Sequence, residues 1–105
     1  MADNFNNIRV IQVYEDDSAT VKDPIDISDF RTVGEFSLQY AITGSTMTIC
    51  YSVSLNGTDY HRPRNTNLVF NKVGTGFMTF QTPICRFIRF ESFGDGTVNG
   101  WLGLQ

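Results

Sequence analysis

The residues most able to do chemistry in this sequence are two cysteines and a single histidine. Cys50 and Cys85 lie 35 residues apart, with His61 between them. A cysteine paired with a histidine is the arrangement of a thiol nucleophile, in which the imidazole takes the thiol proton. Both cysteines fall inside predicted strands, however, and not at a helix N-terminus, which would lower a thiol pKa. No loop typical of an oxyanion hole is recognisable either, so we expect no catalytic residues and no enzymatic activity.

The same two cysteines raise the question of a disulfide. The first residues, MADNFNNIRV, contain no basic segment followed by an apolar run, so we expect synthesis in the cytoplasm, where thiols stay reduced. A disulfide would need Cys50 and Cys85 on adjacent strands, with their Cβ atoms about 4 Å apart. We expect reduced thiols, with the disulfide as the alternative.

Several aspartates have spacings that could serve hydrolysis or a cation. Asp16 and Asp17 are adjacent, and Asp26 precedes Asp29 by three positions. Paired carboxylates can cleave glycosidic bonds, and carboxylate oxygens bind calcium, but neither pair matches a calcium loop of the EF-hand kind. The glycine-rich segment 93–100 could hold a cation through its carbonyls, although a plain hairpin is the simpler interpretation. We expect no metal and no cofactor.

Composition argues against nucleic acid and membranes as partners. The net charge is −3 at pH 7, and the basic residues form no stripe along one predicted element. Gly74-Thr75-Gly76 lacks the further glycine and the lysine of a phosphate-binding loop. No apolar run approaches the roughly 20 residues needed to span a bilayer. We therefore expect neither nucleic acid nor membrane binding.

One short segment is suited to contact with a partner. Tyr60, His61, Arg62 and Arg64 stand around Pro63, which stiffens the loop. An aromatic ring beside two guanidinium groups can contact a protein or a sugar. A solvated loop is the plainer alternative.

The elements that must position these residues are strands, because hydrophobic residues alternate with polar ones along most of the chain. Alternation from Phe36 to Ile42 resumes from Met47 to Leu55, which predicts two antiparallel strands joined by a tight hairpin at Gly44-Ser45. The remaining predicted strands are 8–14, 25–27, 68–70, 77–80, 84–92 and 98–105. About eight short strands without a helix indicate an all-β fold, an antiparallel β-sandwich of jelly-roll type.

The sequence also predicts turns and the limits of the domain. Asn56-Gly57 after an alternating strand predicts a two-residue hairpin, because both residues tolerate the left-handed conformation. The segment 93–96 supplies a further turn, and 15–23 is predicted to be a solvated loop. At 105 residues the chain suits one domain. We assign 1–7 to a flexible or partner-bound arm and 8–105 to a single β-sandwich domain.

A family resemblance emerges from the strand sequences. The chain is similar to small tail or capsid accessory proteins of bacteriophages, and more distantly to discoidin-like sandwiches. In these proteins an aromatic strand and turn precede a proline-led strand, and a "PIDLS" element opens the sandwich, as 22–30 does here. The matching positions are Tyr51, Ser52, Ser54, Asn56, Gly57, Thr58, Tyr60, Pro83, Arg86, Phe87, Ile88, Arg89 and Phe90.

The resemblance implies a non-enzymatic virion structural protein, acting as capsid decoration or as a tail component after synthesis in the host cytoplasm. It implies a homo-oligomer, such as a trimer, that also contacts other virion proteins. Discoidin-like relatives bind sugars or lipids through loops, so the alternative is a carbohydrate-binding module that recognises a cell-surface glycan. This chain departs from the second pattern, because its loops are short and carry a single conspicuous aromatic cluster.

Two aromatic residues complete the predicted contact set. Trp101 lies on the opposite face of the last strand from Leu102 and Leu104, and Phe93 lies in a turn. Large aromatic residues often anchor interfaces. The alternative for Trp101 is that a second layer of the same chain covers it. The predicted partner or glycan contacts are Tyr60, His61, Arg62, Arg64, Phe93 and Trp101.

Overall fold

The computed structural model describes residues 8–28, 30, 35–63 and 67–105. Within these residues there are six strands and no helix, hence no helix able to cross a membrane. The strands are β1 (Arg9–Asp17), β2 (Ile25–Asp26), β3 (Glu35–Ser54), β4 (Val69–Gln81), β5 (Phe87–Gly94) and β6 (Thr97–Leu104). The predicted all-β fold is confirmed, whereas the predicted arm at 1–7 lies outside the described residues.

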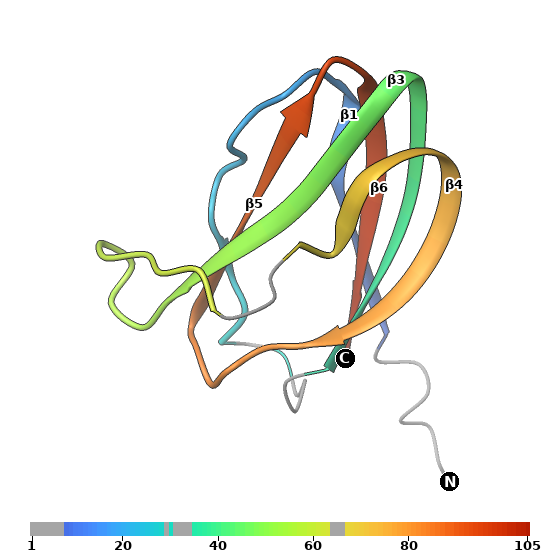
Figure 1. The fold of residues 1–105 in the computed structure, drawn as a ribbon. Coiled ribbons are helices and arrows are strands. Elements are labelled where there is room, and N and C mark those ends of the chain that lie inside the picture. The colour runs from blue at the N-terminus through green and yellow to red at the C-terminus, as the bar shows by residue number, and fades with distance from the viewer. Residues whose placement is uncertain (1–7, 29, 31–34, 64–66) are drawn as a thin grey trace, which may run out of the picture.

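The strands form one antiparallel sheet that curls into an open half-barrel (Figure 1). Its order is β1-β6-β3-β5-β2, and β4 pairs with β3. The first half of β3 lies between β6 and β4, and the second half pairs with β5. We call these the first and second sides of the half-barrel. The six described strands form this single curved sheet, and the expected jelly-roll sandwich of eight strands is not confirmed.

The predicted hairpin at Gly44-Ser45 is wrong, because β3 runs on through it as a single strand of 20 residues. Thr43 pairs with Thr97 and Met47 with Gly94, so three β3 residues, 44–46, face two, 95–96. An extra residue on one strand is a bulge, which bends and twists the pair. Gly44 takes a φ of 84° at this point. We call this place the corner, where β3 and the β5–β6 segment pass together from one side of the half-barrel to the other (Figure 1).

The same bend merges the two predicted strands at 68–70 and 77–80 into β4. β4 follows β3 around the corner, with register shifts between Ile42 and Met47 and between Met47 and Ile49. Asn71 and Gly74 on β4 both have positive φ, which lets the strand coil without breaking. Glycine and asparagine at these positions therefore supply curvature, where the sequence suggested an interruption.

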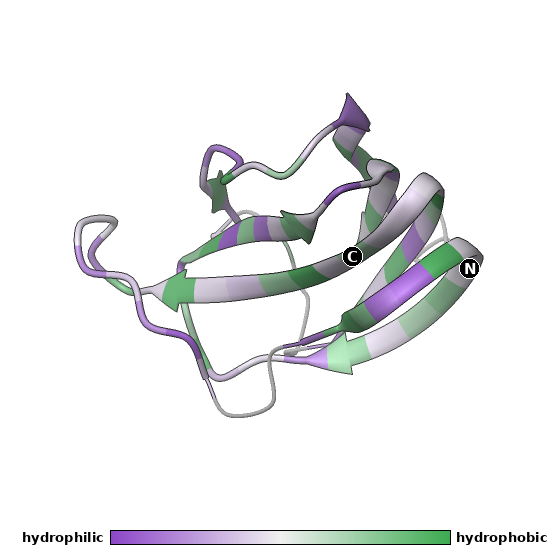
Figure 2. Cartoon of the chain, turned by 45° about the horizontal axis from the view of Figure 1, so that its top comes forward, coloured by the Kyte–Doolittle hydropathy of each residue, from purple (hydrophilic) through white to green (hydrophobic). Residues whose placement is uncertain are grey.

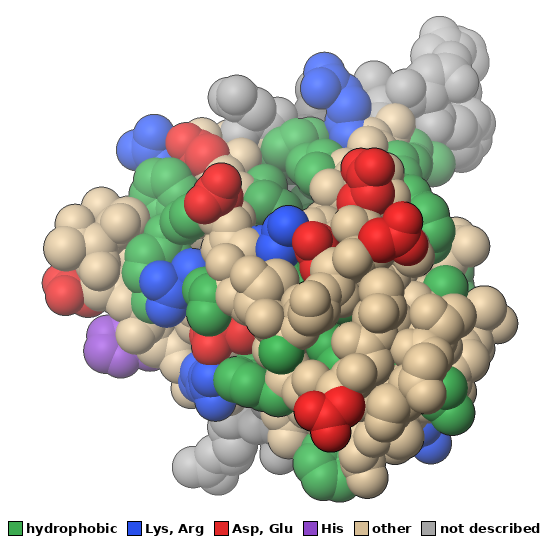
Figure 3. Space-filling view, turned by 90° about the horizontal axis from the view of Figure 1, so that it is seen from above, with side chains coloured by type: hydrophobic (Ala, Val, Ile, Leu, Met, Phe, Trp, Pro, Cys, Tyr) green, Lys and Arg blue, Asp and Glu red, His purple; other side chains and the backbone are tan. Residues whose placement is uncertain are grey.

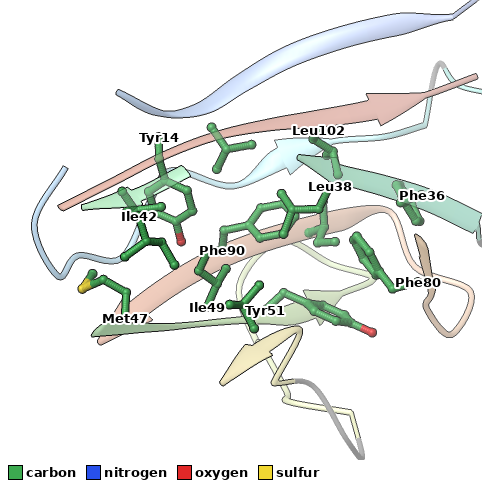
Figure 4. Close-up of a cluster of buried hydrophobic side chains, with 14 of the residues drawn as sticks. Tyr14, Phe36, Leu38, Ile42, Met47, Ile49, Tyr51, Phe80, Phe90 and Leu102 are labelled. Carbon is green, nitrogen blue, oxygen red and sulfur yellow. The ribbon is translucent and has the colours of Figure 1, made fainter. Parts of the chain in front are cut away.

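The core lies between the two sides of the half-barrel. Hydropathy alternates along the strands, so that one face of each is apolar (Figure 2). Side chains from five strands point toward one another across the interior (Figure 4). Phe80 of β4 stacks on Phe36 with ring centroids 5.4 Å apart and lies 5.2 Å from the ring of Tyr51. The fully buried large side chains are Tyr14, Phe36, Phe90, Leu38, Ile42, Met47, Ile49, Ile88, Leu102, Val98 and Cys50.

Candidate interaction surfaces

The loop that follows β3 returns the chain onto the second side of the half-barrel. Backbone hydrogen bonds join Val53 and His61 in both directions, at 2.9 and 3.0 Å. The predicted reversal around Asn56-Gly57 is therefore present, but the loop is longer than a two-residue hairpin. Asn56 does not take a positive φ, although Gly57 does, at 80°. The predicted turn type, which needs positive φ at both residues, is wrong.

The side chain of Asn56 organises this loop. Its Oδ1 accepts hydrogen bonds from the amides of Thr58 and Asp59, both at 2.9 Å, and from the Ser54 hydroxyl at 3.0 Å. Its Nδ2 donates to Asp59 at 3.0 Å. An asparagine that bonds the backbone two and three residues on replaces a backbone turn. Hydrogen bonds from its own side chains thus fix the conformation of the loop, which continues over the outer face of β5.

Tyr60 and Arg62 lie over the outer face of β5. The Arg89 guanidinium stands 4.2 Å from the centroid of the Tyr60 ring, and that of Arg62 stands 5.3 Å from the Phe93 ring. Both distances suit a cation–π contact. Arg62 also donates to Glu91 at 2.7 Å. Three of the predicted contact residues therefore lie together, but Tyr60 and Arg62 already have partners within the chain.

The other predicted residues of the set lie elsewhere. Exposed His61 lines a hollow at the loop end together with Leu55 and Ile84, whose side chains are 70% and 94% exposed. Arg64 lies outside the described residues. Trp101 is half-buried on the first side of the half-barrel. The six residues therefore do not form one site.

Trp101 lies on the outer sheet face, where polar neighbours flank it and exposed apolar residues lie farther out. Gln12 and Gln39 stand opposite it on β1 and β3, and Phe77 is the next residue across, opposite Gln39 on β4. Gly103 lies between Val10 and Ser37 in the next row and offers no side-chain bulk. We name this surface the Trp101 face. Its residues are Ile8, Val10, Glu35, Ser37, Gln39, Phe77, Trp101, Gly103, Leu104 and Gln105.

The Trp101 face is hollow and exposed. It encloses an open depression of about 460 Å³. Ile8, Val10 and Phe77 on its rim are 58%, 67% and 68% exposed. Exposed large apolar side chains around a depression are the usual form of a contact site for a protein or an apolar ligand. The alternation of side chains along the last strand identified Trp101, because it places Trp101 on the opposite face from Leu102. The sequence did not identify Val10 and Phe77, because the strand register was not known.

The two thiols lack the electrostatics of a nucleophile. Burial raises the pKa of Cys50, and it also raises the pKa of Cys85. A reactive thiol needs the opposite shift. Both cysteines are free in the structure. Within the described ranges, no three His, Cys, Asp or Glu side chains gather in a way that could hold a metal ion.

Charged groups are spread over the surface. Acidic and basic side chains are interspersed on the face seen from above, without a broad patch of either sign (Figure 3). Lys22 pairs with Asp17 at 2.9 Å, and Arg86 with Asp26 at 3.2 Å. Exposed pairs of this kind contribute little to stability. The lining of the Trp101 face exposes more apolar than polar surface, and Glu35 is the charged residue within it.

These features define a small all-β protein with an open half-barrel and an exposed apolar sheet face. A solved structure with a similar fold is the crystal structure of SPBc2 prophage-derived protein YomS, with a TM-score of 0.60. The two chains share 13% sequence identity over 92% of this chain and 93% of that one. At this identity the similarity concerns the fold. No model of a known protein family matches the sequence, and no curated protein matches it.

Proposed function

We propose that this chain is a non-enzymatic bacteriophage structural protein, a capsid decoration or tail component that acts through contacts between subunits. The Trp101 face is the observation that carries the proposal, because Val10 and Phe77 present apolar side chains around Trp101 with no layer of the described chain above them. The similarity in fold to a prophage-derived protein supports the same origin. The chain would be made in the host cytoplasm and end in the virion.

Two further observations support a role in assembly. The raised pKa values of Cys50 and Cys85 are unsuited to thiol catalysis. The loop around Asn56 is fixed by its own hydrogen bonds, and a preorganised surface loses little conformational entropy when it binds. The fixed loop suits a subunit whose surfaces must be in place before it assembles.

The decisive experiment is detection in purified particles. Particles released by cells that carry the gene would be separated on a density gradient and probed with an antibody against this chain. We expect the protein in the particle fractions, in a fixed ratio to the major coat or tail protein. Recovery only in the soluble fractions at the top of the gradient would overturn the proposal.

The second candidate is a carbohydrate-binding module. Gln12 and Gln39 flank Trp101, and an aromatic ring with amide groups on both sides can stack on a sugar ring and hydrogen-bond its hydroxyls. The ring of Tyr60, in the region first expected to bind a glycan, is already occupied by Arg89. A glycan array separates the candidates, because a monomer that binds one glycan class through Trp101 favours the module.

A further inference from the structure

β4 has an open hydrogen-bonding edge. It pairs with β3 along one side, and no other described strand pairs with it. Backbone hydrogen bonds outside the named strands likewise involve no residue of β4 in the described chain. Strand edges of this kind are templates for another strand, so natural proteins usually protect them.

The opposite edge of the first side shows what such protection looks like. β1 pairs with β6 through register shifts between Gln12 and Tyr14 and between Tyr14 and Asp17. Asp16 takes a positive φ of 49° there, and the strand ends in three acidic residues, 15–17. Bulges and charges are the devices that prevent pairing between edges.

β4 carries none of these devices along its regular part. From Gly74 to Gln81 it pairs with β3 without a register shift. The segment 73–81, VGTGFMTFQ, contains no charged residue and no proline. Phe77, in the middle of this segment, is 68% exposed. The β1 edge is therefore interrupted by bulges and acidic residues after Gln12, whereas the β4 edge is uncharged throughout 73–81.

We propose that two copies of this chain join by antiparallel pairing of their β4 edges about a two-fold axis at Phe77. The inference rests on the proposed subunit role and names the contact that performs it. With the axis at this residue, Phe77 faces its own copy and Thr75 faces Thr79 of the partner subunit. An axis at Thr75 or Thr79 would carry part of the pairing beyond the regular segment, so Phe77 is the centre that uses all of it.

The pairing is self-complementary, as a two-fold contact requires. It opposes aromatic to aromatic and threonine to threonine, which are favourable cross-strand pairs, and it opposes no like charges. Because the axis is perpendicular to the sheet, the outer faces of both copies point the same way. The two Trp101 faces then merge through the Phe77 pair into one apolar surface.

A cross-linking experiment tests the register. Phe77→Cys would be made in a Cys85→Ser background, since Cys50 is fully buried. Under mild oxidation we expect rapid formation of a disulfide-linked dimer. Val10→Cys in the same background is the matched control, because Val10 is 67% exposed on the same face but lies on β1. Thr75→Cys mixed with Thr79→Cys should also link, and faster than either variant alone.

A charge substitution tests the contact without oxidation. Phe77→Lys places two ammonium groups opposite each other and should weaken the dimer about 100-fold, measured by light scattering against concentration. Val21→Lys should leave the dimer unchanged, because Val21 is 55% exposed but lies neither on β4 nor on the Trp101 face. Circular dichroism would verify that both variants keep their strands.

Three outcomes would overturn the inference. They are linking of Val10→Cys as fast as Phe77→Cys, dissociation by Val21→Lys and not by Phe77→Lys, and a wild-type protein that stays monomeric or forms only trimers. None of them decides the proposed function, because detection in particles is a separate measurement. If the chain is found in particles but does not form this dimer, the proposed β4 contact is wrong and the proposed structural role stands.

Discussion

At the scale of single residues, Arg62 and Glu91 form the ion pair whose loss should lower stability most. Arg62 Nη2 lies 2.7 Å from Glu91 Oε1, and the two side chains are 51% and 10% exposed. The carboxylate is thus largely removed from water, while the guanidinium remains half-solvated. An isolated buried charge is costly, so this pair matters more than its exposed counterparts.

We predict that Arg62→Ala lowers the free energy of unfolding by about 1–2 kcal/mol, between the values for exposed and buried pairs. The physical reason is that the largely buried Glu91 carboxylate loses its hydrogen-bond donor. Urea denaturation measures the change. Arg86→Ala is the control, because Arg86 and Asp26 are 57% and 42% exposed, and we expect a clearly smaller loss. Equal losses in the two variants would contradict this view of Glu91.

A second prediction at this scale concerns acid. Hydrogen bonds from the Ser28 side chain and amide, together with Arg86, lower the pKa of Asp26 to about 2. An unfolded aspartate titrates near 3.9, roughly. The folded state therefore binds fewer protons, so Asp26 contributes stability above about pH 4 that is lost as the pH falls toward 2.

Melting temperatures measured between pH 5 and pH 2 test this. We expect Asp26→Asn to flatten part of the decline between pH 4 and 2. Asp17 contributes in the same direction, because its hydrogen bond from Lys22 lowers its pKa although burial alone would raise it. An unchanged slope in Asp26→Asn would show that Asp26 titrates normally in the folded protein.

At the scale of elements, the corner depends on close approach of two backbones. A Cβ added at Gly96 would overlap the carbonyl oxygen of Ser45 on β3, and one added at Gly94 would overlap that of Thr46. A Cβ at Gly44 would meet nothing within 4 Å. The three glycines therefore serve different purposes, and only those on the β5–β6 segment permit the strands to touch.

We predict that Gly96→Ala destabilises the protein by about 3 kcal/mol or more, because backbone atoms cannot move aside without breaking the corner. Gly44→Ala should cost only about 1–2 kcal/mol, the penalty for its left-handed φ. Thermal or urea unfolding of the two variants measures the difference. A smaller loss at Gly96 than at Gly44 would mean that the strands separate at the corner without consequence.

The alternation of hydrophobic and polar residues predicted the strands and the buried face of each, because side chains alternate along any strand regardless of its partner. Leu38, Ile42 and Leu102 are buried as their phase requires. Pairing could not be predicted in the same way. Gly44-Ser45 has the composition of a hairpin, yet it forms a bulge, because residues 95–96 lie opposite it.

The candidate contact loop shows the same limit. Tyr60 and Arg62 have the composition of an exposed binding patch. They turn onto the sheet because β5, almost 30 residues later, presents Arg89 and Glu91 beneath them. Nothing within the loop itself indicates this. A residue type shows what a side chain can contact, and only the long-range register shows what it does contact.

At the scale of the whole molecule, the Trp101 face should contribute to assembly more than to the stability of the fold. We predict that Trp101→Ala weakens assembly beyond the β4-paired dimer more than it lowers the melting temperature, because Trp101 is half-buried on an outer face and not in the core. Light scattering and calorimetry on the same sample measure both effects. Leu102→Ala is the control, since Leu102 is fully buried and its loss should cost about 2–5 kcal/mol of stability. An unchanged oligomer with a large fall in melting temperature would assign Trp101 to the core.

The pairing of β1 with β6 has a consequence for how the protein is made. β1 comprises residues 9–17, and its strand partner comprises residues 97–104. During translation the first strand leaves the ribosome with no place to dock until nearly all of the described chain has followed it. The nascent polypeptide must therefore remain unfinished and accessible to chaperones for most of its synthesis. Loss of residues 97–104 would therefore leave β1 without its strand partner as well.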